Sequence, residues 1–138
     1  MKFLCKSQIS VEFMVVMAFV LLMITPTILI FRSQIKSMNE QVNINQAYAI
    51  EKKIISSAEE MYYFGSPSKT TIKVYMPSGV KNIKITDNEI IFNVTTQYGT
   101  TEVVQATPVN LTGSISHISG LKYITIESTD TGANITSN

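Results

Sequence analysis

Several residue types are scarce in this chain, and each scarcity excludes some structural feature or class of function. The 138 residues include one cysteine, Cys5, so an intramolecular disulfide is excluded. Cys5 also lacks the small residues that precede a lipidated cysteine. Tryptophan is absent, and 11 basic residues face 10 acidic ones. Without a basic patch, nothing in the chain indicates nucleic-acid binding.

The sequence also lacks the residue clusters that carry catalysis. The single histidine, His117, stands in a serine-rich stretch typical of a solvated loop. No glycine-rich phosphate loop, HExxH motif or nucleophile elbow occurs. Acidic residues, including Glu59 and Glu60, indicate solvated faces, and a hairpin turn explains Asp87-Asn88-Glu89. We therefore expect no catalytic residue, no metal site, no cofactor and no enzymatic activity.

Glycine is missing before Gly65, and proline occurs there only once, at Pro26. This composition predicts one long helix over about residues 9–64, which ends at Gly65. At about 1.5 Å per residue the helix is roughly 84 Å long, far more than a bilayer requires. We expect Pro26 to kink the helix, and the hydroxyls of Thr25 and Thr27 to satisfy the carbonyls that it frees.

What the chain does have is a long apolar run. Phe13 to Phe31 carries no charge and spans roughly 28 Å as a helix, about one bilayer core. The run is too long for a cleaved secretory signal, and no small-residue cleavage site follows it. It predicts a single membrane-spanning segment that stays on the chain. The flanking basic residues are nearly balanced and set its orientation only weakly.

Past Arg32 the apolar residues recur at three- and four-residue spacing. This period predicts that the helix continues with one apolar face, suited to covering a core. The residues of the predicted face are Ile35, Met38, Val42, Ile44, Tyr48, Ile50, Ile54, Ala58 and Met61.

From Ser68 the pattern changes to period two, which predicts strands. We expect a two-residue hairpin turn at Asp87-Asn88, because both residues tolerate the positive φ of tight turns, and a frayed end over Ser128–Asn138. The fold class is α+β: a long helix on a small antiparallel sheet of four or five strands, which needs such a cover. The expected strands are 70–76, 81–86, 89–95, 101–106 and 122–127, with a short one near 109–111.

A short motif precedes the apolar run. Gln8, Ser10 and Glu12 form a Q-x-S-x-E pattern. Together with the apolar helix after it, this pattern resembles the leader junction of archaeal class III signal peptides, found on type IV pilin-like proteins. The resemblance implies that a prepilin-type signal peptidase cuts between Ser7 and Gln8 and leaves the apolar helix on the chain. The family usually has glycine before the cut, and Ser7 is likewise small.

The resemblance also gives Glu12 a role. A carboxylate entering an apolar phase is costly when alone and much less costly beside a cation. In the family, the carboxylate at this position neutralises the new α-amine of a neighbouring subunit, which here is the amine of Gln8. The alternative is that Glu12 stays hydrated in the headgroup region at the edge of the run.

The organisation implied by the resemblance has four parts: a cleaved leader (1–7), a transmembrane and filament-core helix (8–31), its amphipathic continuation (32–65) and an extracellular β domain (66–138). The implied function is structural subunit of an archaeal type IV pilus-like surface filament, for adhesion. The chain is single-pass in the membrane before assembly and extracellular afterwards. Its implied partners are identical or related pilin subunits, the signal peptidase, a membrane platform protein, an assembly ATPase and membrane lipid.

Two rival functions remain open from the residues alone. The first is a membrane-anchored surface binding or adhesion protein that does not polymerise. The second is an enzyme on a membrane tether, which the missing residue clusters disfavour.

Three N-glycosylation sequons stand in the predicted external half, beginning at Asn93, Asn110 and Asn134. Each is an acceptor for an oligosaccharyltransferase, which adds that enzyme to the expected partners. Asn93 falls in a predicted strand and is the least suited of the three. Chance is the alternative, because asparagine and threonine are frequent in this region.

Overall fold

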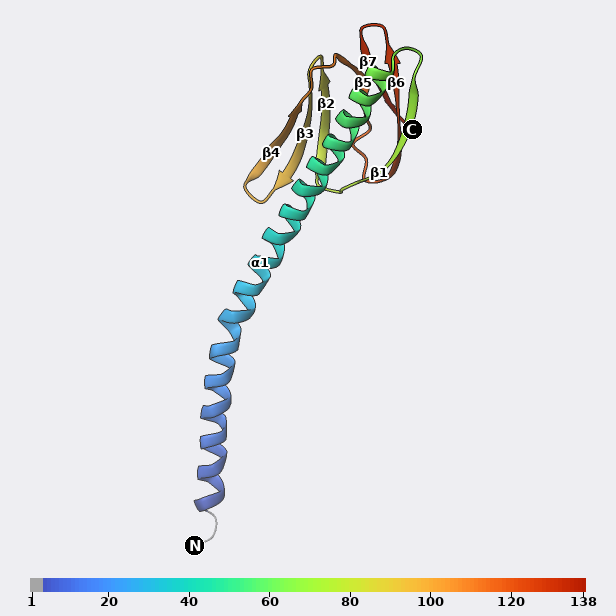
Figure 1. Cartoon of the computed structure of the whole chain (residues 1–138). Coiled ribbons are helices and arrows are strands. Elements are labelled where there is room, and N and C mark those ends of the chain that lie inside the picture. Colours follow the sequence, from blue (N-terminus) through green and yellow to red (C-terminus); the bar gives the residue numbers. More distant parts are fainter. Residues whose placement is uncertain (1–3) are drawn as a thin grey trace. The chain divides into compact units, whose positions relative to one another are not determined.

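The computed structural model describes the backbone of residues 4–138 and the side chains of residues 10–138. The chain divides into two units, Met1–Met38 and Asn39–Asn138. Helix α1 (Leu4–Phe64) runs from the first unit into the second. Every described strand belongs to the second unit (Figure 1). The strands are β1 (Lys69–Met76), β2 (Val80–Thr86), β3 (Glu89–Thr96), β4 (Gly99–Ala106), β5 (Leu111–Ser114), β6 (Gly120–Thr129) and β7 (Gly132–Ser137).

The strands of the second unit form two sheets. One has the order β1-β6-β7-β5 and the other the order β2-β3-β4. Only β5 and β7 pair in parallel. Strand β5 lies beside β2, and the Leu111 N–H donates to the Asp87 carbonyl at 2.7 Å, which joins the two sheets. The predicted α+β class is confirmed as a pilin-like architecture, with seven described strands in two sheets in place of one sheet of four or five.

The core lies between the second half of α1 and both sheets. Alternating residues of the strands point toward the helix, as the period-two pattern requires. Phe92 of β3 and Ile126 of β6 are completely buried, so each sheet contributes a layer. The helix contributes the buried apolar residues Ala47, Ile50, Ile54, Ile55, Ala58 and Met61.

The predicted apolar face of the helix is only partly buried. Glu40 is the first described residue of α1 that is not exposed, so the sheets cover the helix only from there on. The predicted face therefore divides into buried Ile50, Ile54, Ala58 and Met61, partly buried Ile44, and exposed Ile35, Met38, Val42 and Tyr48.

The expectation of a frayed end is wrong. Residues 132–137 form β7, which lies between β6 and β5 and pairs with both. Ala133 and Ile135 are buried in the core, a pattern hidden by the polar residues between them. Gly132 is required for the close approach to β5, because a Cβ there would lie 2.0 Å from the Asn110 carbonyl oxygen.

The two-residue turn at Asp87-Asn88 is confirmed, since Thr86 pairs with Glu89. The expected positive φ is wrong: no described residue other than glycine has one. Side chains hold the turn and its surroundings instead. The Thr86 hydroxyl donates to the Glu89 carbonyl at 3.1 Å, and the Asn88 amide donates to the Thr107 carbonyl at 3.3 Å.

Polar side chains also tie α1 to the sheets. Glu40 Oε1 accepts the Gln97 backbone N–H at 2.8 Å, and Glu59 Oε1 accepts the Thr107 hydroxyl at 2.8 Å. The interpretation of the acidic residues as solvated faces is therefore wrong for these two glutamates. Their carboxylates fix the β3–β4 turn and the segment after β4 against the helix.

Among the described residues, Glu51 is the only charged residue buried in the core. Its side chain is completely buried on the helix face that meets the sheets, and neither carboxylate oxygen has a hydrogen-bond partner. Burial raises the pKa of Glu51 to about 8, and the nearby Phe92 backbone amide opposes this rise without reaching hydrogen-bond geometry. Glu51 is thus protonated at neutral pH in the folded chain.

This burial predicts a pH-dependent stability. The unfolded carboxyl titrates near 4.5 and the folded one near 8, so between these values the folded state holds a proton that the unfolded state has lost. The free energy of unfolding then falls as pH rises through this window, by up to about 1.4 kcal/mol per pH unit, and levels off above it. Glu51→Gln should flatten the profile, measured by urea unfolding of the full chain in detergent with circular dichroism. If the pH profiles of the free energy of unfolding were parallel for Glu51→Gln and the exposed control Glu60→Gln, this prediction would be contradicted.

Candidate functional site

The described side chains in the first half of α1 leave no side of the helix covered. Every described residue from 10 to 39 is exposed. Phe13, Met14, Val15 and Val16 follow one another around a full helical turn and are 64%, 70%, 63% and 59% exposed. A helix that is apolar all round is suited to a membrane or to the centre of a helix assembly. This surface is the candidate functional site, and we call it the apolar helix segment (13–31).

Length and composition agree with that environment. Among the described residues, one helix is long and apolar enough to cross a membrane, and its most apolar window has a mean hydropathy of 2.6 with none of it buried. A segment of this kind near the N-terminus acts as a membrane anchor or as a signal sequence. The Glu59–Thr107 and Glu40–Gln97 bonds involve only the later part of the helix.

The helix continues through Pro26 without interruption. The hydroxyls of Thr25 and Thr27 donate to the carbonyls of Leu21 and Met23, at 2.7 and 3.1 Å. The carbonyl that Pro26 deprives of its N–H partner is that of Leu22, four residues earlier. The flanking hydroxyls therefore strengthen the turn on either side of the freed carbonyl, and the expectation that they bond to that carbonyl is wrong.

The predicted cleavage junction lies near the start of α1. The bond between Ser7 and Gln8 follows the first helical residues, whose amides have no partner within the helix. The side chains of Ser7 and Gln8 are outside the described residues. Residues 8 and 12 are one helical turn apart. Glu12 is exposed, and among the described side chains no cation lies within ion-pair distance of it.

The apolar surface extends further than the sequence pattern indicated. Ile35, Met38 and Val42, predicted to face the core, are 47%, 65% and 50% exposed. They continue the apolar helix segment past Arg32. The pattern could not separate a face for the chain's own core from a face for another molecule, because both have the same period.

The three sequons occupy different surroundings. Asn93 is in β3, the middle strand of its sheet, and its side-chain Oδ1 is buried without a partner. Asn134 is half-buried in β7. Asn110 is exposed in the segment between β4 and β5. Only Asn110 offers a side chain that stands clear of a sheet.

The remaining polar candidates are dispersed. His117 is exposed between β5 and β6, far in sequence from the acidic turn. The backbone of Asp87-Asn88 is occupied, since their carbonyls accept the N–H groups of Leu111 and Thr107. Within the described residues, no three His, Cys, Asp or Glu side chains gather as metal ligands, and no pocket is found.

Comparison with known proteins gives no match to this chain among family models, curated proteins or solved structures.

The sequon geometry predicts selective modification. We expect glycan on Asn110 and none on Asn93, because the transferase must reach the side-chain amide. Intact mass analysis of the chain from its native cells measures this. Asn110→Gln should remove one glycan mass, and the matched Asn93→Gln should leave the mass shift unchanged. Glycan on Asn93 alone would contradict the expectation.

Proposed function

We propose that this chain is a structural subunit, a pilin, of an archaeal type IV pilus-like surface filament that serves in adhesion. A prepilin peptidase cuts it between Ser7 and Gln8. The apolar helix segment holds it in the membrane until it joins the filament, and the sheet-bearing unit is then displayed outside.

One observation carries the proposal: the helix that packs on the sheets extends into a segment whose described side chains are exposed on all sides. Hydrophobic surface of this extent requires lipid or other helices around it. A filament core made of the same segment from many copies provides such surroundings. The Q-x-S-x-E pattern at its start supports a leader cut that leaves the segment intact.

Glu12 supports assembly in preference to a simple anchor. Among the described side chains no cation lies within ion-pair distance of Glu12, and a cation from another copy stabilises a carboxylate in an apolar phase. Cleavage before Gln8 creates an α-amine one turn away along the helix. Two copies staggered by about one turn then place the Glu12 carboxylate of one beside the Gln8 amine of the other, and an ion pair in an apolar phase is favoured over two separate charges. This pairing sets the register of the helices.

The alternative is an anchored surface protein that binds its target as a monomer. It uses the same helix and the same external unit, and it requires neither cleavage nor pairing of Glu12.

The first test is N-terminal mass analysis of the chain from native cells, separated into sheared-surface and membrane fractions. We expect a mature chain that starts at Gln8 in the sheared fraction. A chain that keeps Met1 and stays in the membrane fraction would overturn the proposal and favour the anchored binding protein.

The second test replaces the proposed charge partner. Glu12→Ala should be cleaved normally but should lower the yield of sheared filaments at least about tenfold, equivalent to about 1.4 kcal/mol. The control Glu60→Ala removes an exposed carboxylate from the part of α1 that packs on the sheets, and should assemble normally. An unchanged filament yield with Glu12→Ala would refute the pairing.

A further inference from the structure

The two sheets end in four edge strands: β1 and β5 in one, β2 and β4 in the other. An edge strand presents unpaired N–H and C=O groups that can pair with another chain. Proteins usually block such edges with lysine, proline, bulges, short length or a covering segment. The four edges differ sharply in this respect.

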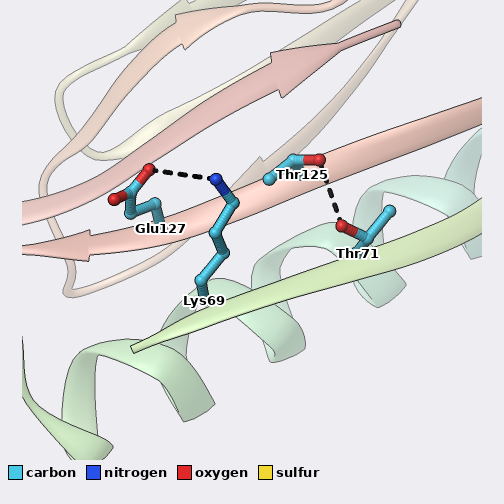
Figure 2. A network of polar contacts seen from close by, with 4 residues as sticks. All are labelled: Lys69, Thr71, Thr125 and Glu127. Atoms are coloured by element: carbon cyan, nitrogen blue, oxygen red, sulfur yellow. Dashed lines mark hydrogen bonds and ion pairs between the residues drawn. The ribbon is translucent and has the colours of Figure 1, made fainter. Parts of the chain in front are cut away.

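Three of the edges are blocked. β5 is four residues long and lies beside β2. β2 carries Lys81 and Lys84, and its register shifts between Val80 and Asn82. β1 carries Lys69, which forms an ion pair with Glu127 at 3.7 Å (Figure 2).

The β1 edge is also capped from the helix. Lys53 Nζ donates to the Lys73 carbonyl at 3.3 Å. Since Ser68 and Ser128 pair through the backbone, even-numbered residues of β1 bond to β6 and odd-numbered ones face outward. The Lys73 carbonyl therefore lies on the free edge, where the lysine of α1 occupies it.

Apart from the charge of Glu102, β4 has no such device. Its sequence, GTTEVVQA, contains no lysine, arginine or proline, and it pairs regularly with β3 along its whole length. It forms the outer margin of its sheet in Figure 1. The Thr107 N–H donates to the Asn88 carbonyl, so odd-numbered residues face β3. The backbone groups of Thr100, Glu102, Val104 and Ala106 face outward.

We propose that the β4 edge pairs with the β4 edge of a second copy of this chain, antiparallel and centred on Val103. In this register Thr100 lies opposite Ala106 of the other copy, and Glu102 opposite Val104. All outward-facing backbone groups of both strands then have partners. Two three-stranded sheets become one continuous six-stranded sheet.

The charge of Glu102 and the alternating direction of the backbone groups both favour this register. Outward groups must face outward groups, so the pairing can shift only by two residues at a time. A shift of two residues in one direction places Glu102 opposite Glu102 of the other copy, where like charges repel. The opposite shift leaves the outward groups of Thr100 unpaired. In the central register each Glu102 faces a valine, and the two Glu102 residues are exposed diagonal neighbours whose Cα atoms are about 7–8 Å apart.

A second copy of β4 also fits better than another edge of the chain. Pairing with β1 would displace Lys53 from the Lys73 carbonyl, and the bulge of β2 interrupts its ladder. A β4–β4 contact has twofold symmetry and pairs chains that point in opposite directions. If the proposed filament is right, this contact joins subunits of two filaments and bundles them.

Cysteine crosslinking of the full chain in detergent micelles tests the register, in a Cys5→Ser background. Val103 meets Val103 of the other copy as a non-hydrogen-bonded pair with Cα atoms about 4.5 Å apart, within disulfide range. We expect Val103→Cys to form at least about tenfold more covalent dimer than Thr101→Cys, whose copies lie roughly 13 Å apart along the strand. Equal crosslinking at both positions would overturn the register.

Proline substitutions test whether the dimer forms through the β4 edge or through the β1 edge. Val104→Pro removes an outward N–H that β3 does not use, so the chain should fold normally by circular dichroism while the Val103→Cys dimer falls to the Thr101→Cys level. Thr71→Pro makes the same change on the outward side of β1 and should leave the dimer unchanged. Loss of dimer with Thr71→Pro but not Val104→Pro would overturn the proposal. These outcomes do not depend on cleavage or on filament yield, so they distinguish this proposal from the proposed function.

Discussion

The packing of α1 against two sheets is the interaction on which the rest of the structure depends. Hydrophobic surface is stable only when it is covered, and the sheets cover the helix only from Glu40 onward. The covered part contains the core and the contact of β5 with β2. It also contains the hydrogen bonds by which Glu40 and Glu59 hold the sheets to the helix. The fully exposed apolar helix segment belongs to the uncovered part. The position at which coverage stops therefore divides the helix into a part that the chain's own core needs and a part that needs other surroundings.

The two proposed contact surfaces differ in specificity. The apolar helix segment is exposed on all sides and has no preferred direction, so in the proposed filament the charge of Glu12 sets the register of the helices. The β4 edge is directional, because backbone alternation and the position of Glu102 permit few registers. In both proposed contacts, polar residues determine how the copies align, while apolar contacts and backbone hydrogen bonds supply the attraction.

Much of the fold could be predicted from the sequence, since period and composition report it directly. The missing glycine before Gly65 indicated the helix, and the period-two pattern indicated most strands. β7 was missed because its inward residues are only Ala133 and Ile135, too few to stand out among polar neighbours. The burial of Glu51 was also missed, because a carboxylate on a helix normally indicates solvent. At the candidate site, the apolar run predicted the segment that is exposed, but no sequence pattern could show where the sheets stop covering the helix.

The place of β7 has a consequence for biosynthesis. β7 lies between β6 and β5, although β5 is translated before both. When β5 leaves the ribosome, its parallel partner has not been made, and the four-stranded sheet cannot close until residues 132–137 have emerged. The apolar helix segment emerges more than one hundred residues earlier. Insertion of this segment into a membrane can therefore precede folding of the sheets.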